Sequence, residues 1–229
     1  GPPGGTPIVP PDTLPGPGVD HAVVYEPAGD RLLIYGGYDD PLNESVLSDT
    51  WALPLGSPAP WAPLNPGGPP LWGSAVILDP IRREMVVFGG SDGGPTSYTF
   101  ALDLVANEWF VHPRIVYGPG VVTPSAVHDP GRNRMVVFGG ARSDYSNEVW
   151  VLTLGALPEW LKLSPTGTPP VPRRLHGAVF DAAGDRMIVF AGFNGAALND
   201  TWALQFSGAL GAAWTQIVPV GPAPPGRRD

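Results

Sequence analysis

One short phrase occurs four times in this sequence and constrains its fold more than any other feature. The copies read "DRLLIYGG" from Asp30, "REMVVFGG" from Arg83, "NRMVVFGG" from Asn133 and "DRMIVFAG" from Asp185. The intervals are 53, 50 and 52 residues, counted from the first residue of each closing pair, at Gly36, Gly89, Gly139 and Ala191. A constant period near fifty residues indicates tandem structural units that pack on their neighbours.

Other parts of the unit recur in phase with this phrase. An apolar run that ends in an acidic turn precedes it, as "HAVVYEP" from His21, "SAVILDP" from Ser74, "SAVHDP" from Ser125 and "GAVFDAAGD" from Gly177. A third run follows it, as "DTWALPL" from Asp49, "YTFALDL" from Tyr98, "EVWVLTL" from Glu148 and "DTWALQF" from Asp200. Each unit then ends near a further tryptophan, at Trp61, Trp109, Trp160 and Trp214. Short apolar runs bounded by Gly, Pro and Asp predict strands, so we expect four antiparallel strands in each unit.

A four-stranded sheet with two apolar faces must cover both, and stacking such sheets around an axis gives a β-propeller. At these residues the sequence resembles the kelch repeat family, whose marks are an apolar strand ending in Gly-Gly, an aromatic residue about a dozen positions later and a tryptophan near the end of the unit. The resemblance covers 20–229, with departures at Ala191, which replaces a glycine, and Phe100, which replaces a tryptophan. It implies an all-β, kelch-type propeller with four blades of four antiparallel strands each.

The repeat also predicts how the chain is organised. We expect a connector from a preceding repeat at 1–19, kelch repeats at 20–64, 65–112, 113–163 and 164–217, and a connector to a following repeat at 218–229. Both ends fall at the same phase of the repeat, so we expect an internal stretch of a longer array. Because kelch propellers usually have about six or seven blades, further blades from the same or another chain are expected, and a closed four-bladed ring is the alternative.

The repeated glycines and aromatic residues have a structural interpretation. Glycine in a strand marks a bend or a close approach, and we expect each pair to admit the large aromatic side chain of the third strand. A phosphate-binding loop would need a helix start after the glycines, and none follows. The third-strand residues Trp51, Phe100, Trp150 and Trp202 are expected to pack between blades.

Composition excludes several classes of protein. The chain has 13 Lys and Arg against 21 Asp and Glu, a net charge of −8, which leaves no basic face for a nucleic acid. It has no cysteine, so disulfides, thiolate metal sites and the cysteine-tyrosine cross-link of kelch-type copper oxidases are excluded. No run of eighteen apolar residues exists, so no membrane insertion is expected. A single lysine and abundant Arg, Ala, Gly and Pro suggest a bacterial protein, and exported bacterial kelch proteins favour a periplasmic or extracellular location.

Strand alternation places the longer loops on one face of the propeller, where we expect ligands to bind. These loops are 38–48, 91–97, 141–147 and 193–199, and the connectors join them on the same face. The candidate ligand-binding residues on this face are Tyr38, Asp39, Asp40, Asn43, Asp92, Arg142, Asp144, Tyr145, Arg173, Arg174, His176 and Asn194.

Each candidate has a structural alternative. The acidic loop from Tyr38 could hold a cation, although its spacing matches no known calcium loop and solvated carboxylates are the alternative. His176 could line a polar channel or be a structural histidine. Arg173 and Arg174 could bind an acidic partner or pair with Asp between blades. Arg142 and Tyr145 together suit a sugar or a peptide, with a purely structural role as the alternative.

The sequence thus favours a kelch-repeat binding or interaction module that recognises a protein or carbohydrate partner through its long-loop face. One alternative is a structural or assembly module of a larger exported bacterial protein. Another is a non-copper kelch enzyme acting on a sugar. No serine-histidine-acid set or zinc motif is recognisable, so we assign no catalytic residue, metal or cofactor.

Overall fold

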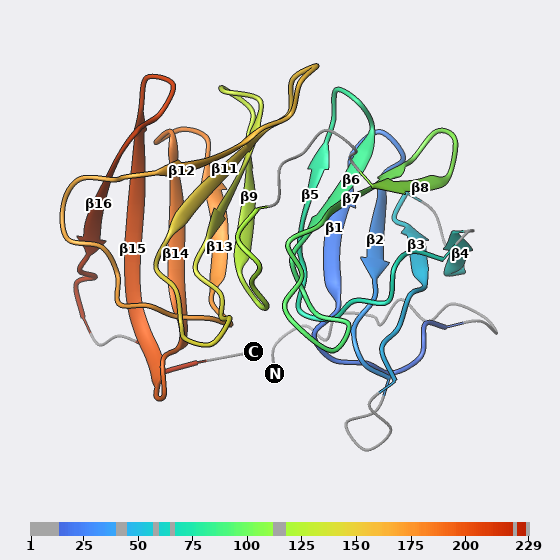
Figure 1. Ribbon diagram of the computed structural model, residues 1–229, viewed down its shortest axis with the longest axis horizontal. Coiled ribbons are helices and arrows are strands. Elements are labelled where there is room, and N and C mark those ends of the chain that lie inside the picture. The colour runs from blue at the N-terminus through green and yellow to red at the C-terminus, as the bar shows by residue number, and fades with distance from the viewer. Residues whose placement is uncertain are drawn as a thin grey trace, which may run out of the picture.

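The computed structural model describes residues 14–39, 45–56, 60–64, 67–111, 118–221 and 224–227. These residues form sixteen strands in four separate four-stranded sheets (Figure 1). Within these ranges the chain contains no helix, so the prediction of an all-β fold is confirmed. It follows that no helix in the described part is long and apolar enough to cross a membrane.

Each sheet is one blade, and its strands are hydrogen-bonded in sequence order, all antiparallel. The first two blades are β1 (Ala22–Glu26), β2 (Arg31–Tyr35), β3 (Thr50–Pro54) and β4 (Ala62–Leu64), then β5 (Ala75–Asp79), β6 (Glu84–Phe88), β7 (Thr99–Asp103) and β8 (Glu108–Val111). The other two are β9 (Ser125–Asp129), β10 (Arg134–Phe138), β11 (Val149–Thr153) and β12 (Trp160–Leu163), then β13 (Gly177–Asp181), β14 (Arg186–Phe193), β15 (Ala197–Ser207) and β16 (Gly211–Ile217). The predicted four blades of four strands are therefore confirmed.

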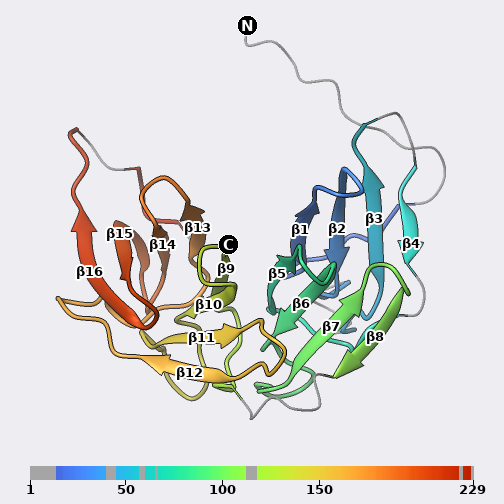
Figure 2. The ribbon, with the colours of Figure 1, turned by 90° about the horizontal axis from the view of Figure 1, so that it is seen from above.

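The blades lie side by side around a common axis. Figure 2 shows them as an arc with β1, β5, β9 and β13 innermost, open between the first and fourth blades. The inner strands contact one another in that order, β1 with β5, β5 with β9 and β9 with β13. This is the arrangement of consecutive propeller blades.

The hydrophobic core lies between the blades. Side chains alternate across each strand, so one set of positions faces the preceding blade and the other faces the next blade. In the cluster between the first two blades, Leu33 and Tyr35 are buried together with Met85 and Val87. Equivalent clusters join the second blade to the third and the third to the fourth. Because β10 has both faces covered, all five of its residues are buried.

A repeated aromatic contact crosses each of these junctions. The last tryptophan of one blade lies against the aromatic residue that precedes the glycine pair of the blade before it. The ring centroids are 4.8 Å apart for Trp109 and Tyr35, 4.3 Å for Trp160 and Phe88, and 4.9 Å for Trp214 and Phe138. Tilted ring pairs at such distances contribute about 0.5–1.5 kcal/mol beyond area burial. The contact explains why both aromatic positions recur in every unit.

The glycine pairs serve a close backbone approach that differs from the expected one. The first glycine has a positive φ, 68° at both Gly89 and Gly139. A Cβ at either position would lie 2.6 or 2.7 Å from a connector carbonyl, that of Val121 or Arg173. The same carbonyls accept hydrogen bonds of 2.9 Å from the second glycines, Gly90 and Gly140. The group that approaches the first glycine is therefore the connector to the next blade, and not the aromatic side chain of the third strand.

The fourth blade departs from the expected loop at 193–199. Its β14 and β15 continue past a register shift between Phe190 and Gly192 and pair again at Gly192 with Leu198 and Phe193 with Ala197. Ala191 keeps the left-handed conformation of the glycine that it replaces, with φ of 61°. Such a conformation costs a residue with a Cβ about 1–2 kcal/mol. The long loop of this blade is consequently a short turn at the tip of a hairpin.

Arginines link neighbouring blades at the tight turns between the first and second strands. Arg132 donates to both carboxylate oxygens of Asp185 in the next blade, at 2.8 and 2.7 Å, and also pairs with the buried Asp129 of its own blade. Arg83 pairs with the buried Glu26 of the preceding blade at 3.3 Å. The acidic turns of the repeat are therefore structural and lie on the face opposite the long loops.

Replacing Trp202 with alanine should lower the free energy of unfolding by about 3–5 kcal/mol, because the ring is buried in the cluster between the third and fourth blades. Urea unfolding measures the change. The exposed Val105, replaced by alanine, is the control and should change stability by less than about 0.5 kcal/mol. Equal unfolding midpoints for Trp202→Ala and the parent would contradict this packing.

Candidate functional site

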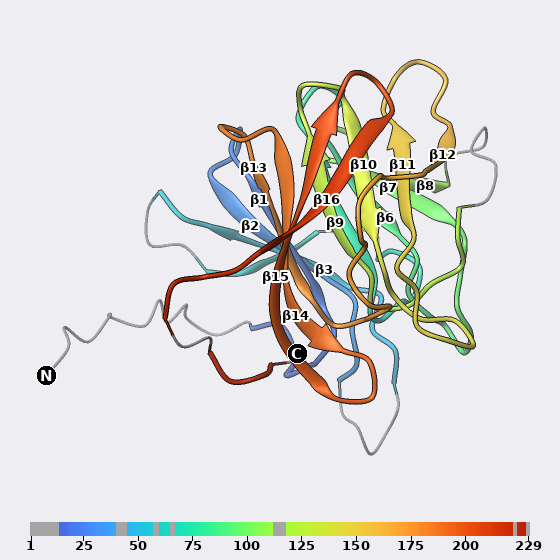
Figure 3. The same cartoon turned by 90° about the vertical axis from the view of Figure 1, so that its left-hand side faces the viewer.

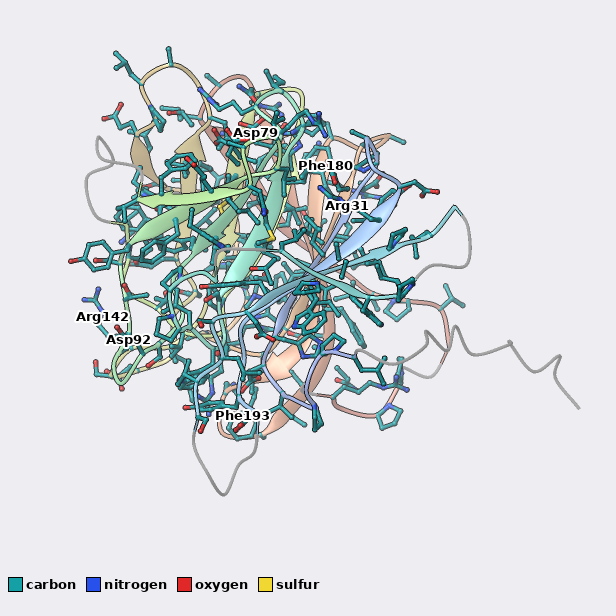
Figure 4. The ribbon with its side chains drawn as sticks, turned by 90° about the vertical axis from the view of Figure 1, so that its right-hand side faces the viewer. Arg31, Asp79, Asp92, Arg142, Phe180 and Phe193 are labelled. Carbon is teal, nitrogen blue, oxygen red and sulfur yellow. The ribbon has the colours of Figure 1, made fainter. Side chains whose placement is uncertain are left out.

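The loops between second and third strands and the connectors lie on one side of the propeller, the long-loop face. This face is at the bottom of Figure 1, and the tight turns between first and second strands are at the top. In Figure 4, Asp92 and Arg142 at the left and Phe193 at the bottom lie lower than Asp79 and Arg31. The two faces predicted from strand alternation are therefore distinct.

A cavity of about 450 Å³ lies on the propeller axis at this face. Equivalent residues just before the inner strands line it and have φ of 55°, 62°, 52° and 54°, at Asp20, Gly73, Thr123 and Leu175. A chain of backbone hydrogen bonds joins them, since each N–H donates to the carbonyl one blade back, from Leu175 to Thr123 (3.2 Å), Thr123 to Gly73 (2.7 Å) and Gly73 to Asp20 (2.9 Å). The wall of the cavity is thus fixed by backbone geometry.

His176 borders this cavity but is buried. Its Nε2 lies 2.7 Å from Ser125 Oγ, and its ring packs edge-on against Phe138. Burial, with a smaller effect of the nearby Arg173 guanidinium, lowers the pKa of His176 to about 3. The imidazole is therefore neutral near pH 7, while its repeat equivalent His21 is exposed.

Arg173 is fully buried and paired within the fourth blade. Its Nη1 and Nη2 donate to Asp200 at 2.6 and 2.8 Å, and Nη1 also donates to the Ala191 carbonyl at 2.9 Å. Its Nε donates to the Val171 carbonyl at 3.1 Å. Although burial opposes the effect, the Arg173 guanidinium lowers the pKa of Asp200, which stays ionised. This is a bidentate guanidinium-carboxylate pair in which each of the three guanidinium nitrogens donates to an oxygen.

An acid two positions before the third-strand tryptophan binds its indole in three of the four blades. The indole Nε1 donates at 2.5 Å from Trp51 to Asp49, at 2.9 Å from Trp150 to Glu148 and at 2.6 Å from Trp202 to Asp200. The second blade has neither partner, because Tyr98 and Phe100 occupy the two positions and their rings lie 5.9 Å apart. A buried N–H needs an acceptor, and phenylalanine has no N–H to satisfy.

These acid-tryptophan pairs line two equivalent cavities on the long-loop face. The first-blade pocket, of about 220 Å³, includes Gly18, His21, Gly36, Leu47, Asp49 and Trp51. The third-blade pocket, of about 350 Å³, includes Val121, Arg142, Asp144, Ser146, Glu148 and Trp150. In the third-blade pocket, the Lys162 ammonium is the main cause that lowers the pKa of Glu148.

The loop between β10 and β11 brings three predicted residues to the surface. Arg142 is exposed and is anchored by its Nε, which donates to the Gly120 carbonyl at 2.9 Å. Asp144 is exposed beside it in the third-blade pocket. Tyr145 points toward the fourth blade, where Arg174 lies over its ring at 5.8 Å and Phe193 meets it edge-on at 6.1 Å.

The remaining predicted residues lie on the same face but apart from this loop. Tyr38 is half-buried against Trp72, with ring centroids 4.9 Å apart, and Asp39 is half-buried beside it. Asp92 is exposed, and the Asn194 Oδ1 accepts a local hydrogen bond from the Ala196 N–H. Asp40 and Asn43 lie outside the described residues. Within the described ranges, no three His, Asp or Glu side chains are close enough together to hold a metal ion.

Sequence reasoning missed the residues that form the pocket walls. The sequence predicts Trp51 and Trp150 as residues that pack between blades, whereas the structure places them half-buried on the pocket walls. Their hydrogen bonds to Asp49 and Glu148 are not part of the sequence prediction. The signal was present, because the acid-x-Trp spacing recurs in three units while both positions change together in the second.

Four-stranded antiparallel blades around one axis, with loops gathered on one face, define a β-propeller domain. Residues 115–229, half of the chain, match a family model described as the KLHDC2/KLHL20/DRC7 Kelch-repeats domain. This region contains the third and fourth blades. A search among curated proteins found no match. The chain belongs to the kelch-repeat family, whose propellers generally serve as protein-interaction modules.

Acid should destabilise the propeller through His176. Because its pKa is about 3 in the folded chain and 6.5 ordinarily, the unfolded chain binds more protons between these values. Stability should therefore fall as pH falls through this window, by up to about 1.4 kcal/mol per pH unit. Urea unfolding from about pH 7 to about pH 4.5 measures the slope. His176→Gln should flatten it and the exposed control His21→Gln should not, so equal slopes for His176→Gln and the parent would refute the assignment.

Proposed function

We propose that this chain binds an extended segment of a protein partner on its long-loop face, centred on the loop between β10 and β11. The observation that carries the proposal is the placement of Arg142 and Asp144 at the mouth of the third-blade pocket, with Trp150 lining it. Both charged side chains are exposed, and the terminal guanidinium nitrogens of Arg142 make no hydrogen bond to any described residue. Charges of both signs beside an aromatic surface suit the polar backbone and side chains of a peptide.

A second surface adjoins the pocket on the other side of this loop. Tyr145, Arg174 and Phe193 form an aromatic and cationic patch between the third and fourth blades. Such residues dominate the binding energy of many protein interfaces, because they bury large areas at low entropic cost. A peptide that crosses the loop would contact the third-blade pocket and this patch together.

Site-specific photo-crosslinking tests the location of the binding face. A photoreactive residue at Ser143, in this loop, should form specific crosslinks in a native lysate, because a bound peptide would pass beside it. The crosslinks should be lost on Arg142→Ala with Asp144→Ala, while the melting temperature stays unchanged since both side chains are exposed.

The matched control carries the same photoreactive residue at Ala156, which is exposed in the turn between β11 and β12. Equal crosslinking from position 156, or crosslinking from position 143 that survives the double substitution, would contradict the proposal. Binding of a glycan on an array, with no protein crosslink from position 143, would assign the same face to a carbohydrate instead.

A second function, assembly with further blades, is supported by the outer faces of the terminal blades. On the first blade Val23 and Tyr25 are 47% and 46% exposed, although their equivalents in the second blade, Val76 and Leu78, pack against the first blade. On the fourth blade Val179 is 62% exposed, although its equivalent in the third blade, Val127, is buried. Adjacent apolar residues at these positions are typical of a surface that another sheet covers.

The connector that follows the fourth blade has the same placement as those between blades. Figure 3 shows the chain after β16 turning back along the base of this blade. The Gly192 N–H donates to the Arg227 carbonyl at 3.0 Å, as the Gly140 N–H donates to that of Arg173 at 2.9 Å. This repeat of the contact between blades supports a further blade beyond the fourth one.

Sedimentation velocity tests the assembly function. The isolated chain should associate as its concentration rises, because each molecule exposes two blade faces that fit other blades. Substituting Tyr25→Lys and Val179→Lys should give a monomer. Ile81→Lys, at a 73% exposed position in a tight turn, is the matched control and should associate like the parent. A parent chain that is monomeric at all concentrations would count against assembly through these faces. So would an Ile81→Lys variant that is monomeric like the variant with Tyr25→Lys and Val179→Lys.

A further inference from the structure

The fourth blade contains an internal example of how this fold holds a guanidinium group. Arg173 reaches from the connector into a site formed by the Asp200 carboxylate and the Ala191 carbonyl, beside the indole of Trp202. Asp200 Oδ1 accepts a hydrogen bond from Nη1, and Oδ2 accepts hydrogen bonds from both Nη2 and the indole N–H. This geometry matches the planar fork of arginine, which a lysine cannot reproduce.

The first blade has the same site without the arginine. Val19 forms an isolated antiparallel β-bridge with Tyr38, as Arg174 does with Phe193. Gly18, the residue before Val19, is therefore the equivalent of Arg173. Asp49 and Trp51 correspond to Asp200 and Trp202 through the same acid-indole hydrogen bond. Gly36 corresponds to Ala191 as the first residue of the pair that closes the repeated phrase.

Gly18 has no side chain, and a pocket lies beside it. The first-blade pocket, of about 220 Å³, lies there, and Gly18, Gly36, Asp49 and Trp51 all line it. Asp49 accepts the indole N–H of Trp51, and no basic side chain of the described residues pairs with it. A carboxylate is thus held in place on the wall of this cavity.

The other two blades do not offer such a site. In the third blade Val121 replaces the arginine, but Glu148 already pairs with Lys162. In the second blade Tyr98 and Phe100 replace the acid and the tryptophan, so no carboxylate is present. Of the four equivalent positions, the first blade is the one that combines a fixed carboxylate, an indole and an open cavity.

We propose that the first-blade pocket is a guanidinium-binding site that takes an arginine side chain of a partner polypeptide. Its guanidinium occupies the position that Arg173 has in the fourth blade, with the Asp49 carboxylate and the Gly36 carbonyl as acceptors and Trp51 as the aromatic wall. Because the pocket is on the open side of the first blade, the arginine comes from the polypeptide that packs there. The site is separate from the surface of the loop between β10 and β11, so either assignment can fail without the other.

Titration with N-propylguanidinium, which reproduces an arginine side chain, tests the proposal. The reporter is the Trp51 indole N–H signal in a nitrogen-proton correlation spectrum, assigned by its loss in Trp51→Phe. The signal should move saturably, and the affinity should fall about tenfold or more in Asp49→Asn, which removes the charge but keeps an acceptor for the indole. N-propylammonium at the same ionic strength should bind more weakly.

The Trp202 signal is the control within the same molecule. It should not respond in the parent, because Arg173 fills the site, and it should respond in Arg173→Gly, which opens the equivalent cavity. The comparison of Asp49→Asn with the parent does not depend on the folding of Arg173→Gly. A Trp51 signal that does not move, that moves equally in Asp49→Asn, or that responds equally to N-propylammonium would overturn the assignment.

Discussion

Each blade of this propeller is positioned by the carbonyl of a connector that lies where a glycine has no Cβ. The Val121 and Arg173 carbonyls approach Gly89 and Gly139 to within 2.6 and 2.7 Å of that missing atom and accept a hydrogen bond from the next glycine. Because the connector leads directly into the next inner strand, this contact fixes where the next blade begins. The aromatic pair before the glycines, such as Phe138 with Trp214, then closes the hydrophobic junction beside it. Ala191 shows that the left-handed conformation is required even where glycine is absent.

The two faces of the propeller differ in how their charges are used. On the face of the tight turns, arginines pair with carboxylates of their own and neighbouring blades, as Arg132 does with Asp129 and Asp185. On the long-loop face, one such pair, Arg173 with Asp200, is buried, whereas Arg142 and Asp144 are exposed and Asp49 faces an open cavity. The first face is therefore held together by its charges. The second face has exposed charges, which is the physical basis for the proposal that a partner binds there.

The sequence was sufficient to predict the strands, the blades and their faces. Period, alternation and turn residues are local properties, and they identified β1 to β16 through runs such as "RMVVFGG". It was less informative about individual contacts. Arg173 and His176 were predicted on the ligand-binding face, yet both are buried, because Arg173 pairs with a carboxylate 27 residues later and His176 packs against Phe138 of the preceding blade. The cavity in the first blade lies beside Gly18. The equivalence of Gly18 to Arg173 follows from the backbone bridges of Val19 with Tyr38 and Arg174 with Phe193, which the sequence alone does not reveal. The hairpin of β14 and β15 exceeded the expected strands because pairing resumed after a bulge.

The exchange of Trp and acid for Phe100 and Tyr98 in the second blade has a consequence for how such a chain diversifies. The indole and its acceptor are two residues apart in the sequence, so a duplicated unit inherits both together. If only the tryptophan or only the acid were replaced later, the other would lose its hydrogen-bond partner. Replacement of both is therefore the accessible evolutionary route. Each copy can therefore lose or retain its cavity independently, while the scaffold that all copies share remains unaltered. The cavities of a tandem array of this kind are set copy by copy, so gene-level recombination of whole units would reorder the cavities without redesigning any of them.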